Sequence, residues 1–109
     1  MSNDRLYLEH IREAIEKITS YSAGGWDEFQ RSPLVQDAVL RNFEIIGEAS
    51  KRLSDAVKSL RPDIPWRQIS AFRNVLIHDY MGVNPQRVWN VVTQDLPVLR
   101  QAVDELLKA

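Results

Sequence analysis

Apolar residues recur at helical spacing along most of this 109-residue chain. From about Asp4 to Tyr21 they occur every three or four positions, with charged residues between them: Leu8, Ile11, Ile15 and Ile18. This spacing predicts a helix with one apolar face. The sequence SAGGW follows and predicts the end of that helix, because Gly24 and Gly25 can adopt left-handed conformations that other residues avoid.

The second predicted helix is unusually long. Ser32 suits the N-cap position and Pro33 suits the first helical position. The apolar period then continues from Val35 to about Leu60. At 1.5 Å per residue such a helix would be roughly 40 Å long, which favours an antiparallel bundle over a compact orthogonal array.

Prolines divide the rest of the chain. The sequence RPDIP interrupts the helical pattern, and Pro65 can start a third helix that ends near Tyr80. The last segment contains Pro97, so we expect either a kinked helix or two helices with a break near Asp95 and Leu96. Because no stretch alternates with a period of two, the prediction is an all-α bundle of four to five helices, forming a single domain over residues 1–109.

Composition narrows the possible chemistry. The formal net charge is −1, from 14 basic and 15 acidic residues, so any contact with a nucleic acid is expected to be local. The chain has no cysteine and two histidines far apart, which argues against thiolate chemistry and a structural metal site. We therefore expect no metal and no cofactor. The charged start MSNDRLYLEH and the lack of a long apolar run predict a cytoplasmic protein with no membrane segment.

The sequence FRNVLIHDYMG combines an arginine, a histidine and a tyrosine in a helix-like apolar run. On an ideal helix, Phe72 and Leu76 would face the core, while Arg73 and Tyr80 would share one row. Arg73 and His78 would lie about 140° apart around the axis. If both serve one chemical centre, either the helix unwinds before His78 or two chains supply the groups.

The neighbouring residue Ile77 is apolar but lies off the predicted core stripe, which favours a contact between subunits. We therefore expect a symmetric dimer in which both motifs face a shared cleft. Histidine suits proton transfer near neutrality, and arginine offers a forked set of donors to phosphate oxygens. Together, pairs of Arg73 and His78 could support metal-free RNA cleavage. The alternatives are a surface Arg73, a His78 favoured by the helix dipole, and a Tyr80 that only packs its ring.

Residues Arg73, Asn74, His78 and Tyr80 spell R-N-x-x-x-H-x-Y, which resembles the motif of HEPN-domain proteins of the HepT-like toxin family. The segments NFEIIGEASKRLS, IPWRQISAFRNVLIHDY and VWNVVTQDLPVLR also resemble successive segments of that family. The resemblance thus covers most of the chain.

The resemblance implies a HEPN bundle that dimerises and acts as a metal-independent endoribonuclease, the toxin of a type II or type VII-like toxin–antitoxin pair. It implies that Arg73 stabilises the scissile phosphate, that His78 is the general acid and base, and that Asn74 supports them. The implied partner is a minimal nucleotidyltransferase antitoxin, which silences the toxin by binding it, by adenylylating Tyr80, or by both.

Two other classes of function stay open at this point. One is a non-catalytic HEPN module that binds the nucleotidyltransferase or a nucleotide. The other is a structural helical dimer in which the motif stabilises the interface.

Overall fold

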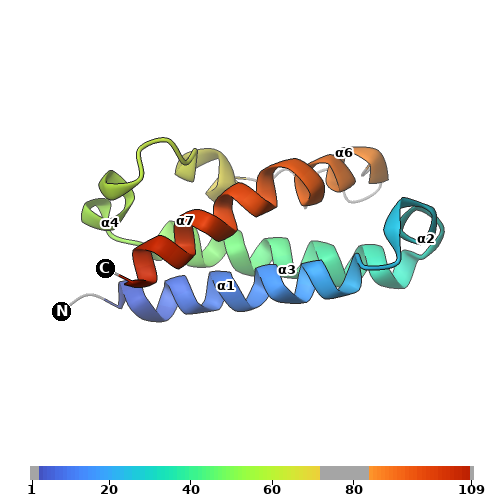
Figure 1. Ribbon diagram of the computed structural model, residues 1–109, viewed down its shortest axis with the longest axis horizontal. Helices are drawn as coiled ribbons and strands as arrows, with labels where there is room; N and C mark the ends of the chain where they lie inside the picture. The colour runs from blue at the N-terminus through green and yellow to red at the C-terminus, as the bar shows by residue number, and fades with distance from the viewer. Residues whose placement is uncertain (1–2, 72–83, 109) are drawn as a thin grey trace.

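The computed structural model describes residues 3–71 and 84–108, and within these ranges it contains helices but no β-strand. The long helices lie side by side in an elongated bundle (Figure 1). The predicted all-α fold is therefore confirmed. The elements follow one another as α1 (Asp4–Tyr21), α2 (Gly25–Arg31), α3 (Pro33–Arg52), α4 (Asp55–Leu60), α6 (Pro85–Asn90), η1 (Val91–Asp95) and α7 (Leu96–Lys108).

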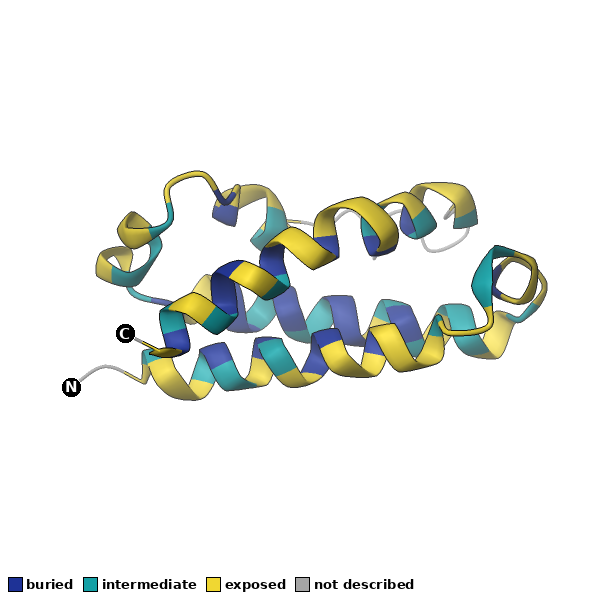
Figure 2. Ribbon diagram, in the orientation of Figure 1, coloured by how far each residue is buried: buried dark blue, intermediate teal, exposed yellow. Residues whose placement is uncertain are grey.

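The core is built around α1, whose predicted limits are confirmed. This helix packs against α3 and α7, and both of these run in the opposite direction to it (Figure 1). Figure 2 shows the buried positions of the three helices turned toward one another. The predicted apolar stripe of α1 is almost fully buried, with Leu8, Ile11, Ile15 and Ile18 each at most 3% exposed.

The short helix α2 was not predicted, because SAGGW signals a helix end. Gly25 has a positive φ of 84°, which a glycine adopts at little cost, and the chain turns there into a seven-residue helix. Phe29 of α2 is buried beside the rings of Trp26 and Trp89. Since Trp89 lies far along the sequence, α2 depends on a tertiary contact that local spacing does not reveal.

The predicted second helix begins as expected but is shorter. Ser32 caps α3 by accepting a hydrogen bond from the Val35 amide, and Pro33 occupies the first turn. However, α3 ends at Arg52 after 20 residues, because Leu53 leaves the helical conformation and Ser54 caps the separate helix α4. The prediction of one helix to about Leu60 is therefore wrong, and the rod is roughly 30 Å long instead of roughly 40 Å.

Asp4 gives the physical reason for this break. Its carboxylate accepts hydrogen bonds from the Ser54 amide, at 2.8 Å, and from the Ser54 hydroxyl, at 2.6 Å. Hydrogen bonds to a charged group are stronger than those between neutral groups. The start of α1 thus holds the junction between α3 and α4 in a non-helical conformation.

The last segment was expected to be kinked or broken near Asp95 and Leu96, and the structure has a π-helical segment there, η1, within a continuous helical run. Here the Leu96 amide donates to the Val91 carbonyl, five residues back. Pro97 lacks an amide hydrogen, and its ring would clash with the carbonyl four residues earlier in a regular helix. The wider π turn accommodates the proline, so α6, η1 and α7 continue without a gap.

Ser50 is a buried polar residue that the fold does not satisfy. It is 0% exposed, and its hydroxyl has no hydrogen-bond partner among the residues that the structure describes. Replacing it by alanine removes an unpaired polar group from the core. We expect Ser50→Ala to raise the free energy of unfolding by about 1 kcal/mol and the melting temperature by roughly 4–8 °C.

Thermal unfolding measured by circular dichroism tests this expectation. The control is Ser59→Ala, because the exposed Ser59 hydroxyl donates to the Asp55 carbonyl within α4. That control should change stability by less than about 0.5 kcal/mol. A lower melting temperature for Ser50→Ala would contradict the interpretation.

Candidate functional site

The predicted site residues Arg73, Asn74, His78 and Tyr80 lie outside the residues that the structure describes. The expected core positions Phe72 and Leu76 and the interface position Ile77 lie there too. What the structure describes is the frame on both sides of the motif. This frame consists of the helical stretch 66–71 before it and α6 after it.

The stretch 66–71 begins where RPDIP predicted a new helix. The Pro65 carbonyl accepts a hydrogen bond from the Ile69 amide, as expected for a residue at a helix start. Ile64 and Trp66 are 4% and 7% exposed, so the turn that leads into this helix is anchored in the core. The chain therefore enters the motif from a packed starting point.

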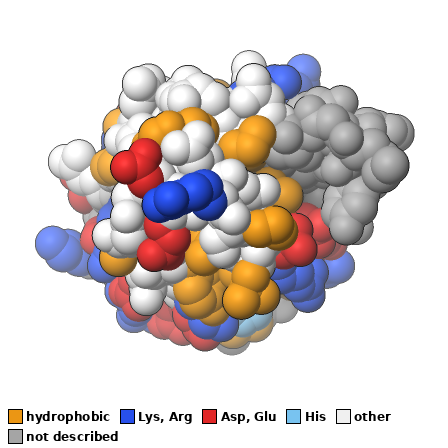
Figure 3. All heavy atoms as spheres, turned by 90° about the vertical axis from the view of Figure 1, so that its right-hand side faces the viewer, with side chains coloured by type: hydrophobic (Ala, Val, Ile, Leu, Met, Phe, Trp, Pro, Cys, Tyr) orange, Lys and Arg blue, Asp and Glu red, His pale blue; other side chains and the backbone are white. Residues whose placement is uncertain are grey.

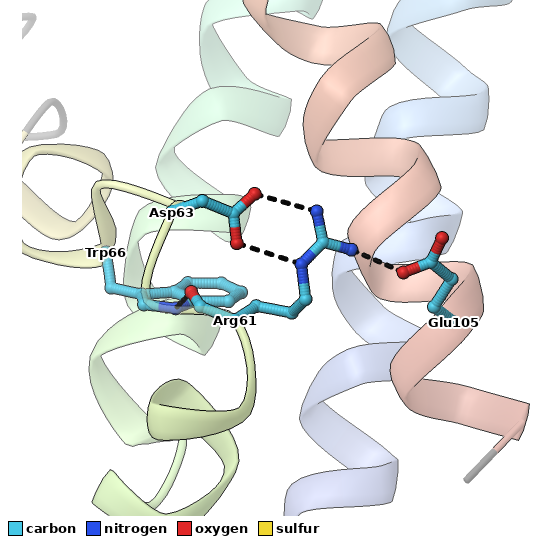
Figure 4. A network of polar contacts seen from close by, with 4 residues as sticks. All are labelled: Arg61, Asp63, Trp66 and Glu105. Atoms are coloured by element: carbon cyan, nitrogen blue, oxygen red, sulfur yellow. Dashed lines mark hydrogen bonds and ion pairs between the residues drawn. The ribbon is translucent and has the colours of Figure 1, made fainter.

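Arg61 organises the same turn by polar contacts (Figure 4). Its guanidinium makes a forked contact with the Asp63 carboxylate, at 2.9 and 2.8 Å, and also reaches Glu105 of α7 at 2.5 Å. The Arg61 carbonyl accepts a hydrogen bond from the Trp66 indole at 3.1 Å. A single residue thus joins α7 to the turn before the motif.

The hydrogen bonds from Arg61 hold the pKa of the Asp63 carboxyl below its usual value. The same pairing with Asp63, supported by Glu105, raises the pKa of Arg61. Both partners are therefore charged near neutral pH, and the three-residue contact is an ion pair network.

On the far side of the motif, Asn84 caps α6. Its side-chain oxygen accepts a hydrogen bond from the Gln86 amide at 2.9 Å, and Pro85 occupies the first turn. Val88 of α6 is buried, so this end is also held by the core. Asn84 and Pro85 together therefore define the start of α6.

An apolar cavity of about 290 Å³ lies beside the entry to the motif. Its walls come from α3, from residues 64–69, and from η1 and α7, and they are formed mainly by aliphatic and aromatic side chains. Among its described lining residues, only Gln68 and Asp95 are polar. The described part of the cavity wall therefore carries no cation that could hold a scissile phosphate.

Many basic side chains of the described residues are neutralised by nearby carboxylates. Arg41 pairs with Glu44 at 3.2 Å, and Arg52 pairs with Glu48 at 3.2 Å. At the end of the molecule formed by α2 and α6, Figure 3 shows basic side chains next to acidic ones. Over the described residues, such intermixed charges give no extended electrostatic surface for RNA.

The surface between α1 and α7 is acidic on balance. A polar depression there is lined by four carboxylates and two arginines: Glu9, Arg12, Glu13, Glu16, Arg100 and Asp104. One of these arginines, Arg100, contacts both Glu16 and Asp104 at 3.2 Å. This face would repel a phosphate backbone rather than bind it.

Sequence reasoning missed the ion pair network of Arg61. The nearby Arg-x-Asp spacing of Arg61 and Asp63 is visible in RPDIP, but Glu105 lies 44 residues further along and carries no local signal. Arg67 and Arg87 were also not singled out. Both are exposed, and they lie on the helical stretches before and after the motif.

Within residues 3–71 and 84–108, no cluster of three or more histidine and acidic side chains could hold a metal ion. The helices described in these ranges also include none with the length and apolar character needed to span a bilayer.

Comparison with known proteins identifies the class to which this fold belongs. Residues 11–106 match the family model described as "Ribonuclease HepT-like". The chain is 42% identical over 103 residues to "Probable ribonuclease HepT" of Thermococcus cleftensis, covering 94% of each chain. It is 35% identical over 109 residues to "Putative RNase TTE0752" of Caldanaerobacter subterraneus subsp. tengcongensis, covering 99% of this chain and 97% of the relative.

No solved structure was found to match the chain. The family match nevertheless spans nearly its whole length, so the chain belongs to the HepT-like ribonuclease family. The resemblance inferred from the motif and its flanking segments is thereby confirmed at the level of the family.

The shifted pKa of Asp63 leads to a prediction about pH. Because its folded pKa is lowered, Asp63 stabilises the fold above its unfolded pKa of about 3.9, and this contribution is lost as the pH falls through the folded value. Wild type should therefore melt above Asp63→Asn at pH 7, and the gap should narrow as the pH falls below about 3.9.

Melting curves recorded across this pH range provide the measurement. Glu13→Gln is the control, because it removes an exposed pair with Lys17 inside α1 and should have a smaller effect at pH 7. A gap between wild type and Asp63→Asn that stays constant with pH would show that the Arg61 pairing is not its source.

Proposed function

We propose that this chain is a cytoplasmic, metal-independent endoribonuclease that acts as the toxin of a type II or type VII-like toxin–antitoxin pair, in the form of a single HEPN domain over residues 1–109. The observation that carries the proposal is the R-N-x-x-x-H-x-Y sequence of Arg73 to Tyr80 in a chain of the HepT-like ribonuclease family.

The proposed chemistry divides between two side chains. Arg73 binds the scissile phosphate and stabilises the negative charge that builds on it, since its guanidinium stays protonated and offers paired donors. His78 removes the proton from the ribose 2′-hydroxyl and returns a proton to the leaving oxygen, as a group with a pKa of about 6.5 can near neutral pH. Asn74 supports these groups by hydrogen bonding. No metal ion takes part.

The active form is a homodimer. Arg73 and His78 are five positions apart, which on an ideal helix separates them by about 140° around the axis. An Arg73 from one chain and a His78 from the other can therefore meet more readily than the two residues of one chain. The charge distribution supports a local site of this kind. Arg41 and Arg52 are paired with glutamates, so they attract RNA weakly. In this proposal the RNA is therefore held mainly by the arginines of the shared cleft.

We further propose that a minimal nucleotidyltransferase is the antitoxin. It silences the toxin by binding it, by transferring AMP to Tyr80, or by both. On an ideal helix Tyr80 would share a row with Arg73, so the phosphate of an added AMP would set a negative charge against the guanidinium and block RNA.

The first test is to substitute the proposed catalytic residues. We expect His78→Ala and Arg73→Ala each to lower the rate of RNA cleavage at least about 100-fold, because each removes a group that acts in the transition state. Cleavage of a labelled RNA by purified protein is measured with a chelator present. Growth and RNA integrity after induced expression are followed in parallel.

The matched control is His10→Ala, because His10 is the other histidine and lies exposed on α1. It should cleave like wild type, and all variants should keep the wild-type melting temperature.

Co-expressing Arg73→Ala with His78→Ala under different tags tests the shared cleft, since the mixed dimer should regain part of the activity. Equal cleavage by wild type and His78→Ala would refute the catalytic role.

The second test concerns Tyr80. After co-expression with the nucleotidyltransferase, we expect intact-mass measurement to show the added mass of AMP on wild type and none on Tyr80→Phe, which lacks the acceptor hydroxyl. Tyr21→Phe is the control, because Tyr21 is 40% exposed on α1 and its loss should not change labelling. If Tyr80→Phe gains the same mass, the acceptor is another residue.

The competing function is a non-catalytic HEPN module that binds the nucleotidyltransferase or a nucleotide. The same experiments separate the two functions. A module of this kind would form a complex with the partner while wild type and His78→Ala leave RNA equally intact.

A further inference from the structure

The turn between α4 and the helical stretch 66–71 is held by two different kinds of interaction. Ile64 and Trp66 are buried, which fixes how deeply the turn sits in the core. Burial is non-directional, so it does not by itself set the angle at which the following helix leaves the turn. A second, directional interaction is needed for that.

Arg61 supplies this interaction. Its side chain is 22% exposed, and its guanidinium is held in one plane by the fork to Asp63, while a third contact runs to Glu105 on α7 (Figure 4). Forked arginine–carboxylate pairs fix geometry as well as distance. The Arg61 carbonyl then receives the Trp66 indole hydrogen, so the same residue orients the first residue of the stretch 66–71.

This ion pair network lies just before the motif in the sequence, so it can affect where the motif is placed. Trp66 begins the helical stretch, and Arg73 follows seven residues later. A change in the direction of the stretch 66–71 therefore changes the direction from which the chain enters the motif. A misplacement of about 1 Å at a reacting group can cost on the order of 100-fold in rate.

Resting on the ribonuclease function proposed above, we propose that Arg61 is a positioning residue for RNA cleavage. With Asp63 and Glu105 it clamps the entry to the motif against α7 and sets the direction from which Arg73 is presented. Arg61 acts through this clamp and does not touch the substrate.

The chain offers a matched control in Arg100. This arginine also contacts two carboxylates, Asp104 on its own helix and Glu16 on α1, and it is 38% exposed. Its contacts tie α7 to α1 and do not involve the turn before the motif. Arg100→Gln therefore removes a comparable ion pair network from elsewhere on α7.

The experiment compares Arg61→Gln, Glu105→Gln and Arg61→Lys with Arg100→Gln. Cleavage of a fluorescent single-stranded RNA gives kcat and KM, and amide hydrogen exchange is followed over residues 66–71. We expect Arg61→Gln to lower kcat about tenfold or more with KM within about twofold, and to speed exchange in 66–71. Glu105→Gln should show the same changes more weakly, because the fork to Asp63 remains.

Arg61→Lys separates geometry from charge. Lysine keeps the positive charge but cannot form the fork, so its kcat should stay at least about threefold below wild type. Arg100→Gln should match wild type in kcat and in the exchange of 66–71, with a melting temperature close to that of Arg61→Gln.

Equal kcat values for Arg61→Gln and Arg100→Gln would overturn the proposal, and so would unchanged exchange in 66–71. Full activity of Arg61→Lys would show that charge alone matters, which also contradicts a clamp. Failure of the ribonuclease function itself looks different, because wild type would then cleave no better than His78→Ala. In that case the exchange data still decide whether Arg61 holds the start of the helix.

Discussion

Burial of one face of α1 is the constraint on which the other elements depend. Leu8, Ile11, Ile15 and Ile18 are nearly inaccessible to solvent, and they pack against α3 on one side and α7 on the other. Because α3 and α7 both pack on α1, the buried face of α1 determines how α3 and α7 are placed relative to each other. Asp4 extends this control to the chain beyond α3, since its bonds to Ser54 decide where that helix stops.

The sequence predicts those features that local chemistry determines. The apolar period of α1, the cap at Ser32 and the interruption at Pro97 each act within a few residues, and each is confirmed. The family was also visible in advance, through Arg73, His78 and the segments around them. By contrast, the end of α3 depends on Asp4, about fifty residues away, so the apolar period alone placed it too late.

The same distinction applies to the frame of the site. Trp89 stabilises α2 and Glu105 holds Arg61, and in both cases the partner lies far along the chain. No spacing rule links such residues before the fold is known. The predicted roles of Arg73, Asn74, His78 and Tyr80 rest on the motif and the family, because these residues lie outside the described ranges.

The charge pattern connects the fold to the proposed chemistry. Arginines that pair with carboxylates, such as Arg61 and Arg100, stabilise contacts between helices instead of attracting RNA. A ribonuclease with this surface cannot rely on a broad field to hold its substrate. In the function proposed above, the affinity for RNA comes from cations concentrated at one place, and the proposed dimer doubles their number there. A formal net charge of −1 is therefore compatible with the proposed shared cleft.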